Sequence, residues 1–430
     1  MENSLHPWRA ETIAALPQSS RDSLGPMKLL AFFLIALCSV AADYFPPPDS
    51  SGGWRTLTKP DDIRAMAGMD RAKLDAAFDY TKDSTQHGGL LVVRHGYLVF
   101  EKYFGRGDRE AIPELASCGK AFTSIAVGIA LKEKAALIPD GLNQKVFTPK
   151  YMPAEIFPLD DPRKADINLG QLLAMSAGIR GVNPVYVHGE KQTWDAPSVD
   201  GPIATTDPVA LHEKLWCAPG ECYSYATSSP HLASIVLRQL VGMEMEQYIR
   251  LKIAGPLGFG TWGYAMYRPN LKAGIDSEGR LEHTPGGGSI AVRSTDVLRF
   301  VYLLLHEGKW GNQQIVPASF VKMCGKLSSF NPHFSHSFNF NVNEDGHIPG
   351  VPQDAYWKAG AGGYCMYVVP SLDMVIYKMG GNEGQYDPKL TGLPVTYAYD
   401  GSRAGWKLDK AKVGDSTAQT LQKVVAAVVK

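Results

Sequence analysis

Apolar residues recur along the chain with two periods, one of about 3.6 residues and one of two, and each period predicts one kind of element. Helical spacing, or an uncharged run typical of a buried helix, occurs at 69–82, 117–131, 167–175, 231–243, 294–305 and 418–429. Runs typical of strands occur at 88–93, 97–104, 364–369 and 373–379. Because strands lie near both ends and helices between them, we predict one sheet built from both termini with an inserted helical lobe.

Two stretches break this pattern. Residues 183–202 are rich in Gly, Pro and aromatic side chains, which predicts a loop that could rim a pocket. Residues 43–64 contain a cluster of Pro, Ser and Gly, which predicts a linker.

The N-terminal region has the pattern of an export signal. Lys28 precedes an uncharged apolar run over 29–42 that ends in small residues, as in a secretory signal peptide. We therefore predict that translation starts at Met27, that residues 1–42 are an upstream extension and signal peptide, and that cleavage falls close to Ala41 or Ala42. The alternative is a cytosolic tail before a buried helix.

Composition narrows the class of protein further. The chain has 430 residues, 45% of them hydrophobic, with 43 basic and 43 acidic side chains. This is a large globular protein, and its formal net charge of zero gives no reason to expect nucleic acid or an anionic membrane as a partner. Cys217 and Cys222 are the closely spaced pair among six cysteines, and an oxidising compartment would allow them to form a bridge.

One stretch combines residue types that can form a nucleophile. Ser117 and Lys120 are three residues apart, so on a helix they share one face. The following run, 121–131, carries no charge, which indicates a buried helix. A lysine in apolar surroundings favours its neutral form, which can take a proton from serine, and a helix N-terminus favours negative charge at Ser117. This is the pattern of an activated nucleophile, although Ser-x-x-Lys is common by chance.

Two later stretches carry residues that could assist this serine. Tyr225 follows a Pro-Gly turn and precedes a helix. A tyrosine near a lysine can be stabilised as phenolate and act as a base. Lys358 precedes the small residues Ala359 and Gly360 on a predicted edge strand. There the lysine could bind an anionic group, and the small residues would let a substrate lie against the backbone.

Taken together, these stretches resemble the serine β-lactamase and penicillin-binding protein superfamily, most closely its class C-like branch. That branch includes family VIII esterases and 6-aminohexanoate-dimer hydrolases. Residues 117–120 (Ser-Cys-Gly-Lys) match the family's Ser-x-x-Lys, 225–227 (Tyr-Ala-Thr) are similar to its Tyr-x-Asn, and 358–360 (Lys-Ala-Gly) are similar to its Lys-Thr-Gly. The motifs follow in the family's order, and the resemblance spans about residues 65–400.

The resemblance implies a fold and a division of the chain. The fold class would be α/β (α+β) and serine β-lactamase-like, with an antiparallel sheet built from both termini and flanked by helices, an inserted all-helical lobe, and the active site between them. The catalytic domain would be 65–430, with 65–120 and 295–430 forming the α/β lobe and 121–294 the helical lobe.

The resemblance also implies roles for individual residues. Ser117 would be the nucleophile, and Lys120 and Tyr225 would share the roles of general base and acid. The backbone N–H groups of Ser117 and Ala361 would form an oxyanion hole. Lys358 would orient the site, and the substrate-binding set would be Thr227, Lys358, Gly360 and Ala361. No metal or organic cofactor is implied.

Two departures from the family bear on the substrate. Thr227 stands where the family has asparagine, and Ala359 where it has threonine. Both changes disfavour β-lactam hydrolysis more than serine chemistry itself. We therefore expect a secreted or periplasmic serine hydrolase, without a stable membrane anchor after cleavage, that acts on a small ester, amide or peptide. The alternatives are a β-lactamase or D-alanyl-D-alanine carboxypeptidase, and a non-catalytic binding or scaffold protein.

Overall fold

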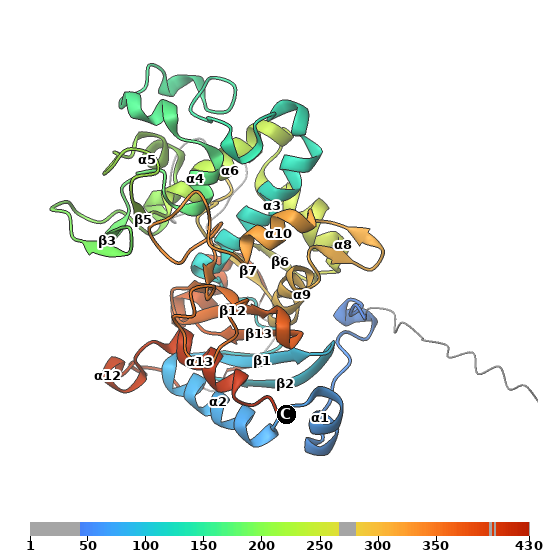
Figure 1. Cartoon of the computed structure of the whole chain (residues 1–430). Helices are drawn as coiled ribbons and strands as arrows, with labels where there is room; N and C mark the ends of the chain where they lie inside the picture. The colour runs from blue at the N-terminus through green and yellow to red at the C-terminus, as the bar shows by residue number, and fades with distance from the viewer. Residues whose placement is uncertain (1–43, 266–280, 395–397, 400, 430) are drawn as a thin grey trace, which may run out of the picture. The chain divides into compact units, whose positions relative to one another are not determined.

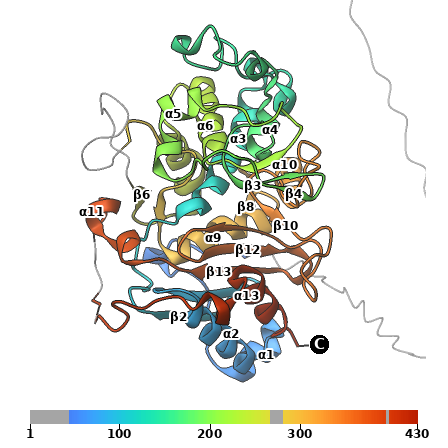
Figure 2. The same cartoon turned by 90° about the vertical axis from the view of Figure 1, so that its left-hand side faces the viewer.

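The computed structural model describes residues 44–265, 281–394, 398–399 and 401–429. The predicted extension and signal peptide, 1–42, lie outside the described residues. From Tyr44 onward the described chain forms one compact unit. Figures 1 and 2 show a central sheet with helices on both faces and further helices beyond one of them.

The helices and strands have the following bounds. The helices are α1 Pro60–Ala67, α2 Arg71–Ser84, α3 Gly119–Glu133, α4 Leu169–Ala174, α5 Asp207–His212, α6 Ser228–Val241, α7 Met245–Ile249, α8 Gly255–Leu257, α9 Ser294–Leu305, α10 Ala318–Cys324, α11 Pro388–Thr391, α12 Lys410–Val413 and α13 Ser416–Val425. The strands are β1 Gly88–Arg94, β2 Tyr97–Phe104, β3 Val182–Val187, β4 Glu190–Gln192, β5 Tyr223–Tyr225, β6 Trp262–Tyr264, β7 Ile290–Val292, β8 Lys309–Trp310, β9 Gln313–Gln314, β10 Asn341–Val342, β11 Tyr356–Gly360, β12 Tyr364–Val369 and β13 Met374–Met379.

The main sheet joins the two ends of the described chain. Its six strands lie in the order β10-β11-β12-β13-β1-β2, and each neighbouring pair is antiparallel. The N-terminal strand β1 pairs with the C-terminal strand β13, so that Val92 lies opposite Ile376. The predicted antiparallel sheet built from both termini is therefore confirmed.

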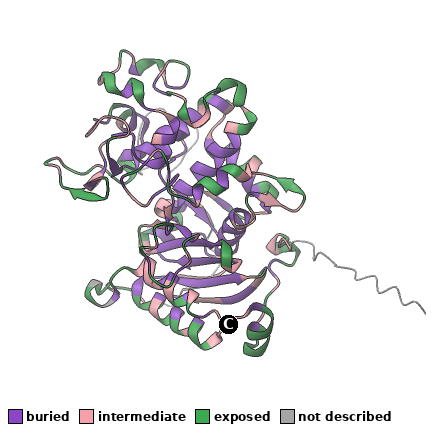
Figure 3. Cartoon of the chain, in the orientation of Figure 1, coloured by how far each residue is buried: buried purple, intermediate pink, exposed green. Residues whose placement is uncertain are grey.

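Alternation of side chains along the strands divides the core into two layers. On β1, Leu91 and Val93 belong to the larger core, which the sheet shares with α3 and α9. Leu90 and Val92 point to the opposite face, where α2 and α13 cover the sheet. Because both faces are covered, β12 and β13 are buried throughout and β1 is buried up to Val93, and Figure 3 shows the buried centre of the sheet.

Helix α3 is buried over most of its length, which explains why 121–131 carries no charge. It packs against α6, and Phe122 stacks on Phe300 of α9 with ring centroids 3.8 Å apart.

The predicted boundaries between the two lobes stay a prediction. Within the described segments, no helix is both long enough and apolar enough to cross a bilayer.

The predicted linker over 43–64 is corrected by the structure, which describes it from Tyr44. The guanidinium of Arg299 on α9 is fully buried and donates hydrogen bonds to Asp49 Oδ1 at 2.5 Å and to the Pro47 carbonyl at 2.6 Å. Trp54 is only 4% exposed. This stretch is packed because a buried guanidinium needs acceptors, and the N-terminal arm supplies them.

The predicted loop over 183–202 is also partly wrong. Strands β3 and β4 form a hairpin there, and β3 pairs with β5 to complete a three-stranded sheet. After β4 the chain runs as a loop to the 3₁₀ turn Pro202–Thr205. Just before β5, Cys217 and Cys222 are joined by a disulfide.

Candidate active site

Ser117 lies in a 3₁₀ turn, Ala116–Cys118, that leads directly into α3. Two hydrogen bonds hold the N-terminal side of this turn in place. The N–H of Leu115 donates to the carbonyl of Ile290 at 2.9 Å, and the N–H of Ala116 donates to Glu114 Oε1 at 2.7 Å. Ala116 has a φ of +48°, a left-handed value that few non-glycine residues adopt. The turn is thus a constrained support for the serine.

Lys120 is the second residue of α3 and is fully buried. Its Nζ lies 2.8 Å from Ser117 Oγ and 2.6 Å from the carbonyl oxygen of Gly287. Burial holds the pKa of Lys120 below its usual value, although the nearby Tyr225 opposes this effect, and Lys358 lowers it further. A lysine with a lowered pKa can accept the serine proton.

Tyr225 ends β5 and lies between two lysines. Lys358 Nζ is 3.4 Å from the Tyr225 hydroxyl oxygen, and the Nζ atoms of Lys120 and Lys358 lie 5.1 and 4.9 Å from its ring centroid. Burial alone would raise the pKa of Tyr225. The charges of both lysines, together with hydrogen bonds with Ser117 and Lys120, outweigh burial and lower this pKa to about 8. The phenolate is therefore accessible near neutral pH.

Strand β11 lies directly against the serine turn. The Cys118 thiol donates to the carbonyl of Lys358 at 3.3 Å, and a Cβ on Gly360 would lie 2.4 Å from the carbonyl oxygen of Leu115. Burial raises the pKa of Cys118 to about 12, so this thiol is a packing group and not a second nucleophile.

The predicted edge position of β11 holds in part. In the described chain β10 pairs with β11 only at Tyr356 and Trp357, so the stretch 358–360 has a partner strand on one side only, β12. The other side of the stretch, which has no partner strand in the described chain, is the one on which a substrate could lie against the backbone.

Thr227 lies at the start of α6 and is 3% exposed. Its hydroxyl donates a short hydrogen bond to Asp200 Oδ1, which comes from the loop before the 3₁₀ turn at Pro202. The sequence did not indicate Asp200, because one aspartate in a polar loop carries no signal of where the loop folds back.

A cavity of about 270 Å³ opens beside Ser117. Its lining residues are Glu114, Ala116, Ser117, Lys120, Asp200, Gly201, Pro202, Thr205, Thr227, Gly287, Gly288, Ser289, Ala361, Gly362, Asn382 and Gln385. Four of the residues predicted from sequence, Ser117, Lys120, Thr227 and Ala361, therefore share one cavity. Tyr225, Lys358 and Gly360 are not among the lining residues, but each contacts the group around Ser117.

The cavity also contains Glu114 and Gln385, which no sequence pattern indicated as site residues. Glu114 is 9% exposed, and burial raises the pKa of its carboxyl group. Gln385 Nε2 donates to the Glu114 carboxylate at 3.3 Å and to the Ala361 carbonyl at 3.2 Å. These contacts connect the turn before Ser117 with the turn after β11. No local pattern links positions 271 residues apart, so sequence alone could not reveal them.

Comparison with known proteins places the chain in a family. The family described as Beta-lactamase matches residues 74–380. PbpX of Bacillus subtilis, a protein named for penicillin binding, is 25% identical over 248 residues, which cover 55% of this chain and 59% of PbpX. The chain thus matches somewhat more than half the length of this curated relative.

Solved structures show the same fold. A Bacillus anthracis protein named as a 6-aminohexanoate-dimer hydrolase is similar with a TM-score of 0.56 and 18% identity, over 88% of this chain and 90% of that chain. A family VIII carboxylesterase is similar with a TM-score of 0.51 and 17% identity, over 74% and 94% of the two chains.

These findings confirm two predictions from the sequence: the superfamily resemblance and the fold class. The family match covers well over half of the chain and includes all three motifs. The chain therefore belongs to the Beta-lactamase family.

Proposed function

We propose that this protein is an exported serine hydrolase that cleaves a carboxylic ester or amide through an acyl-enzyme on Ser117. The observation that carries the proposal is the position of the Lys120 amine, fully buried and 2.8 Å from the Ser117 hydroxyl. A buried amine in hydrogen-bond contact with a serine is the arrangement that activates the hydroxyl for attack.

The proposed reaction has two halves. Ser117 Oγ attacks the substrate carbonyl carbon while its proton passes to Lys120 or Tyr225. The oxyanion forms beside the backbone N–H groups of Ser117 and Ala361, two residues that line the cavity. The proton returns to the leaving oxygen or nitrogen, and the acyl group stays on Ser117. A water molecule, deprotonated by the same base, then releases the acid and restores the serine.

The remaining predicted residues would act on this core. The Lys358 amine lies 3.4 Å from the Tyr225 hydroxyl, and its electrostatic effect on Tyr225 favours the phenolate. Gly360 admits the serine turn against β11 and leaves room for a substrate along the strand. Thr227 forms part of the cavity wall.

The contact between Thr227 and Asp200 favours esters over β-lactams. The Thr227 hydroxyl has one proton, and that proton is donated to Asp200, so it is not available to a substrate amide. The Asp200 carboxylate also lines the cavity, where it repels the carboxylate that β-lactams and D-alanyl-D-alanine peptides carry. We therefore propose a small acyl ester as the preferred substrate.

Export is supported by two features. The uncharged run after Lys28 has the composition of a signal peptide. The disulfide between Cys217 and Cys222 belongs to an oxidising compartment, outside the cytosol. N-terminal sequencing of the exported protein should find a chain that begins close to Ala41 or Ala42, and a mature chain that begins at Met1 would contradict cleavage of a signal peptide.

The test of the catalytic proposal is covalent labelling combined with rates. A fluorophosphonate probe should label Ser117, and Ser117→Ala should lower ester hydrolysis by about 10⁴- to 10⁶-fold. Ser329→Ala, an exposed serine, is the matched control and should keep the wild-type rate. Folded wild-type protein that takes no label, or a label that maps to another serine, would sink the mechanism and favour a non-catalytic binding protein.

Side-by-side rates decide the substrate class. We expect a p-nitrophenyl ester of a short acid to be hydrolysed faster than nitrocefin and a D-alanyl-D-alanine peptide. The relative named for penicillin binding makes these two the relevant competitors. If kcat/KM for nitrocefin equals that for the best ester, the proposed ester preference is wrong and the protein is a β-lactamase.

A further inference from the structure

The proposed base Lys120 depends on one backbone carbonyl outside any helix or strand. Its Nζ donates to the Gly287 carbonyl oxygen at 2.6 Å, besides its contact with Ser117. Gly287 is closely enclosed, because a Cβ there would lie 2.5 Å from Thr227 Cγ2 and 2.6 Å from Thr205 Cγ2. The position of this carbonyl therefore sets the direction in which the Lys120 amine points.

The preceding residue, Gly286, is held on both of its peptide groups. Its N–H donates to His231 Nδ1 at 3.2 Å, and its carbonyl accepts from Thr123 Oγ1 at 2.7 Å. A Cβ on Gly286 would lie 2.5 Å from the carbonyl oxygen of Pro230, so the backbone rests directly on α6. Two side chains from two helices thus fix the peptide next to the Lys120 acceptor.

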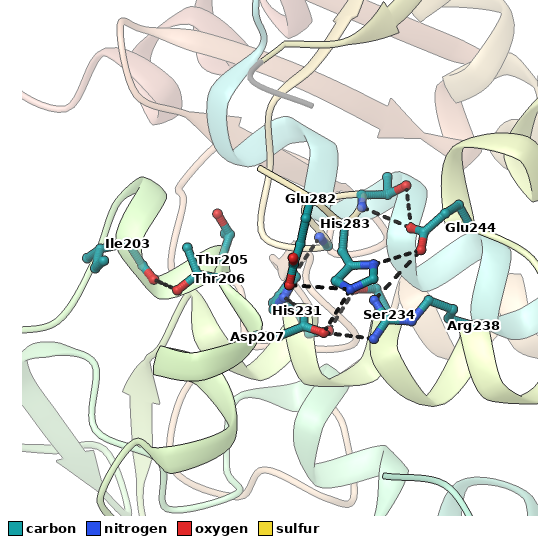
Figure 4. Close-up of polar contacts among 12 residues, drawn as sticks. Ile203, Thr205, Thr206, Asp207, His231, Ser234, Arg238, Glu244, Glu282 and His283 are labelled. Atoms are coloured by element: carbon teal, nitrogen blue, oxygen red, sulfur yellow. Dashed lines mark hydrogen bonds and ion pairs between the residues drawn. The ribbon is translucent and has the colours of Figure 1, made fainter. Parts of the chain in front are cut away.

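His231 is itself oriented by a buried ion pair. It is fully buried on α6, and its Nε2 lies 2.9 Å from Asp207 Oδ1, while Arg238 donates to Asp207 Oδ2 at 2.7 Å (Figure 4). Because Nδ1 accepts from Gly286, the ring proton resides on Nε2 and is donated to Asp207. Burial would raise the pKa of Asp207, but the hydrogen bond from His231 and the nearby cations hold it far below its usual value.

The same group of side chains holds the segment further upstream. His283 Nδ1 lies 2.9 Å from Glu244 Oε1, and the N–H of Thr284 donates to Glu244 Oε2 at 3.0 Å (Figure 4). Asp207, Glu282 and His283 lie close enough to hold a metal ion. However, both oxygens of the Asp207 carboxylate already accept hydrogen bonds, one from His231 and one from Arg238. We therefore infer that this group of side chains holds the backbone around Gly286 in place and does not bind a metal.

We propose that His231 is a positioning residue of the hydrolase, which acts on Lys120 through the backbone of Gly286 and Gly287. This inference rests on the proposed function. Loss of the His231 acceptor frees the Gly286 N–H, and the Gly287 carbonyl then shifts. The Lys120 amine moves with it, away from Ser117 Oγ. Displacement of a catalytic group by about 1 Å costs about 10²-fold in rate.

Two substitutions of His231 distinguish the roles of its two ring nitrogens. His231→Asn places an amide oxygen near the position of Nδ1 and keeps an acceptor for Gly286, whereas His231→Gln reaches toward Asp207 and loses that acceptor. We expect His231→Gln to lower kcat for a p-nitrophenyl ester by about 10²-fold with little change in KM, and His231→Asn to recover most of that loss. His212→Gln, an exposed histidine on α5, is the control and keeps the wild-type rate.

A spectroscopic measurement tests the hydrogen bonds without reference to activity. In ¹⁵N-histidine spectra of the full wild-type chain, the His231 signal, assigned by its loss in His231→Asn, should show a protonated Nε2 and an unprotonated Nδ1 at neutral pH. A protonated Nδ1 would overturn the proposal, because that nitrogen could not accept from Gly286. Thr123→Val removes the second anchor of Gly286 and should lower kcat in the same way.

The outcomes distinguish this inference from the proposed function. If the fluorophosphonate probe fails to label Ser117 in wild-type protein, the proposed function fails. If Ser117 is labelled normally and His231→Gln matches His212→Gln in kcat, only the role of His231 is refuted. Should His231→Gln not fold, the ¹⁵N spectrum and Thr123→Val decide: an unchanged kcat in Thr123→Val refutes the proposal.

Discussion

At the scale of single residues, electrostatics around one phenol sets the chemistry of the site. Tyr225 lies between the buried amines of Lys120 and Lys358, which are 0% and 2% exposed. Two buried cations beside one buried hydroxyl lower the free energy of the phenolate and disfavour a second ammonium charge. The same contacts therefore lower the pKa of Tyr225 to about 8 and help to lower that of Lys120.

This arrangement predicts a pH dependence. A phenolate base is present above its pKa, so kcat/KM for an ester should rise with pH through about 8 and then level. Tyr225→Phe should remove this rise and lower the rate by about 10²- to 10⁴-fold. Tyr80→Phe, on α2 at the far face of the sheet, is the control. A wild-type profile that is flat between pH 6 and 9 would exclude Tyr225 as the base, as would an unchanged rate in Tyr225→Phe.

A second prediction concerns Thr227. Asparagine at this position has two amide donors, so one can bind Asp200 while the other serves a substrate amide. Thr227→Asn should therefore raise nitrocefin turnover relative to ester turnover by about tenfold, the worth of one hydrogen bond of about 1.5 kcal/mol. The comparison is made with Thr227→Val, which cannot donate. If both variants keep the wild-type ratio, residue 227 does not select the substrate.

At the scale of elements, the site depends on how closely β11 approaches the serine turn. Helix α3 begins immediately after the turn, and β11 passes behind it close enough that only glycine fits at 360. The contact is between backbones, with Leu115 on one side and Gly360 on the other. The strand and the turn must therefore move together.

Gly360→Ala tests this contact. The new methyl group would start 2.4 Å from the Leu115 carbonyl oxygen, so β11 or the turn must shift. We expect kcat for an ester to fall by about 10²-fold while the protein stays folded. Gly263→Ala on β6 is a matched control, because among the described residues its methyl group would meet only Leu393 Cδ2, at an ordinary 3.6 Å. Equal kcat values for the two variants would show that the backbone contact does not govern the site.

At the scale of the whole described unit, the two chain ends close the sheet, and the arm that starts at Tyr44 is tied to α9. Arg299 is fully buried and pairs with Asp49 on the arm and with Asp296 on its own helix. Burial works against ionisation of Asp49, but the hydrogen bonds from Arg299 and Thr295 hold its pKa below the usual value. The arm is thus part of the folded body.

Asp49→Asn should destabilise the protein by about 2 kcal/mol, because it leaves part of the charge of the buried Arg299 unpaired. The effect is smaller than for a fully buried pair, because the Asp49 side chain is partly exposed to solvent. The measurement is urea unfolding, and Asp61→Asn, an exposed acid on α1, is the control. Since the pKa of Asp49 is lowered on folding, its contribution is complete above the usual carboxyl pKa and is lost as pH falls below it. A difference from wild type that does not shrink in acid would contradict this origin.

The local parts of this protein could be predicted from its sequence. The spacing of Ser117 and Lys120, and the absence of charge after them, indicated a nucleophile before a buried helix, because neighbours three residues apart meet through helical geometry alone. Strands β1, β2, β12 and β13 of the main sheet could be predicted for a similar reason, since alternation and β-branched residues reflect burial on a pleated surface, whereas the two-residue strand β10 carries no such pattern.

Only the tertiary structure decided which distant residues complete the site. Asp200, Gln385 and His231 reach their partners across chain separations that no periodicity records, and each contact depends on where a loop or a helix end comes to rest. The stretch around Asp49 has the sequence pattern of a linker for the same reason: Pro and Gly indicate an irregular backbone, but they do not indicate what packs on it. The spacing of neighbouring residues determines which of them meet within one helix or strand. The packing of the whole core determines which residues meet when they are far apart in the sequence.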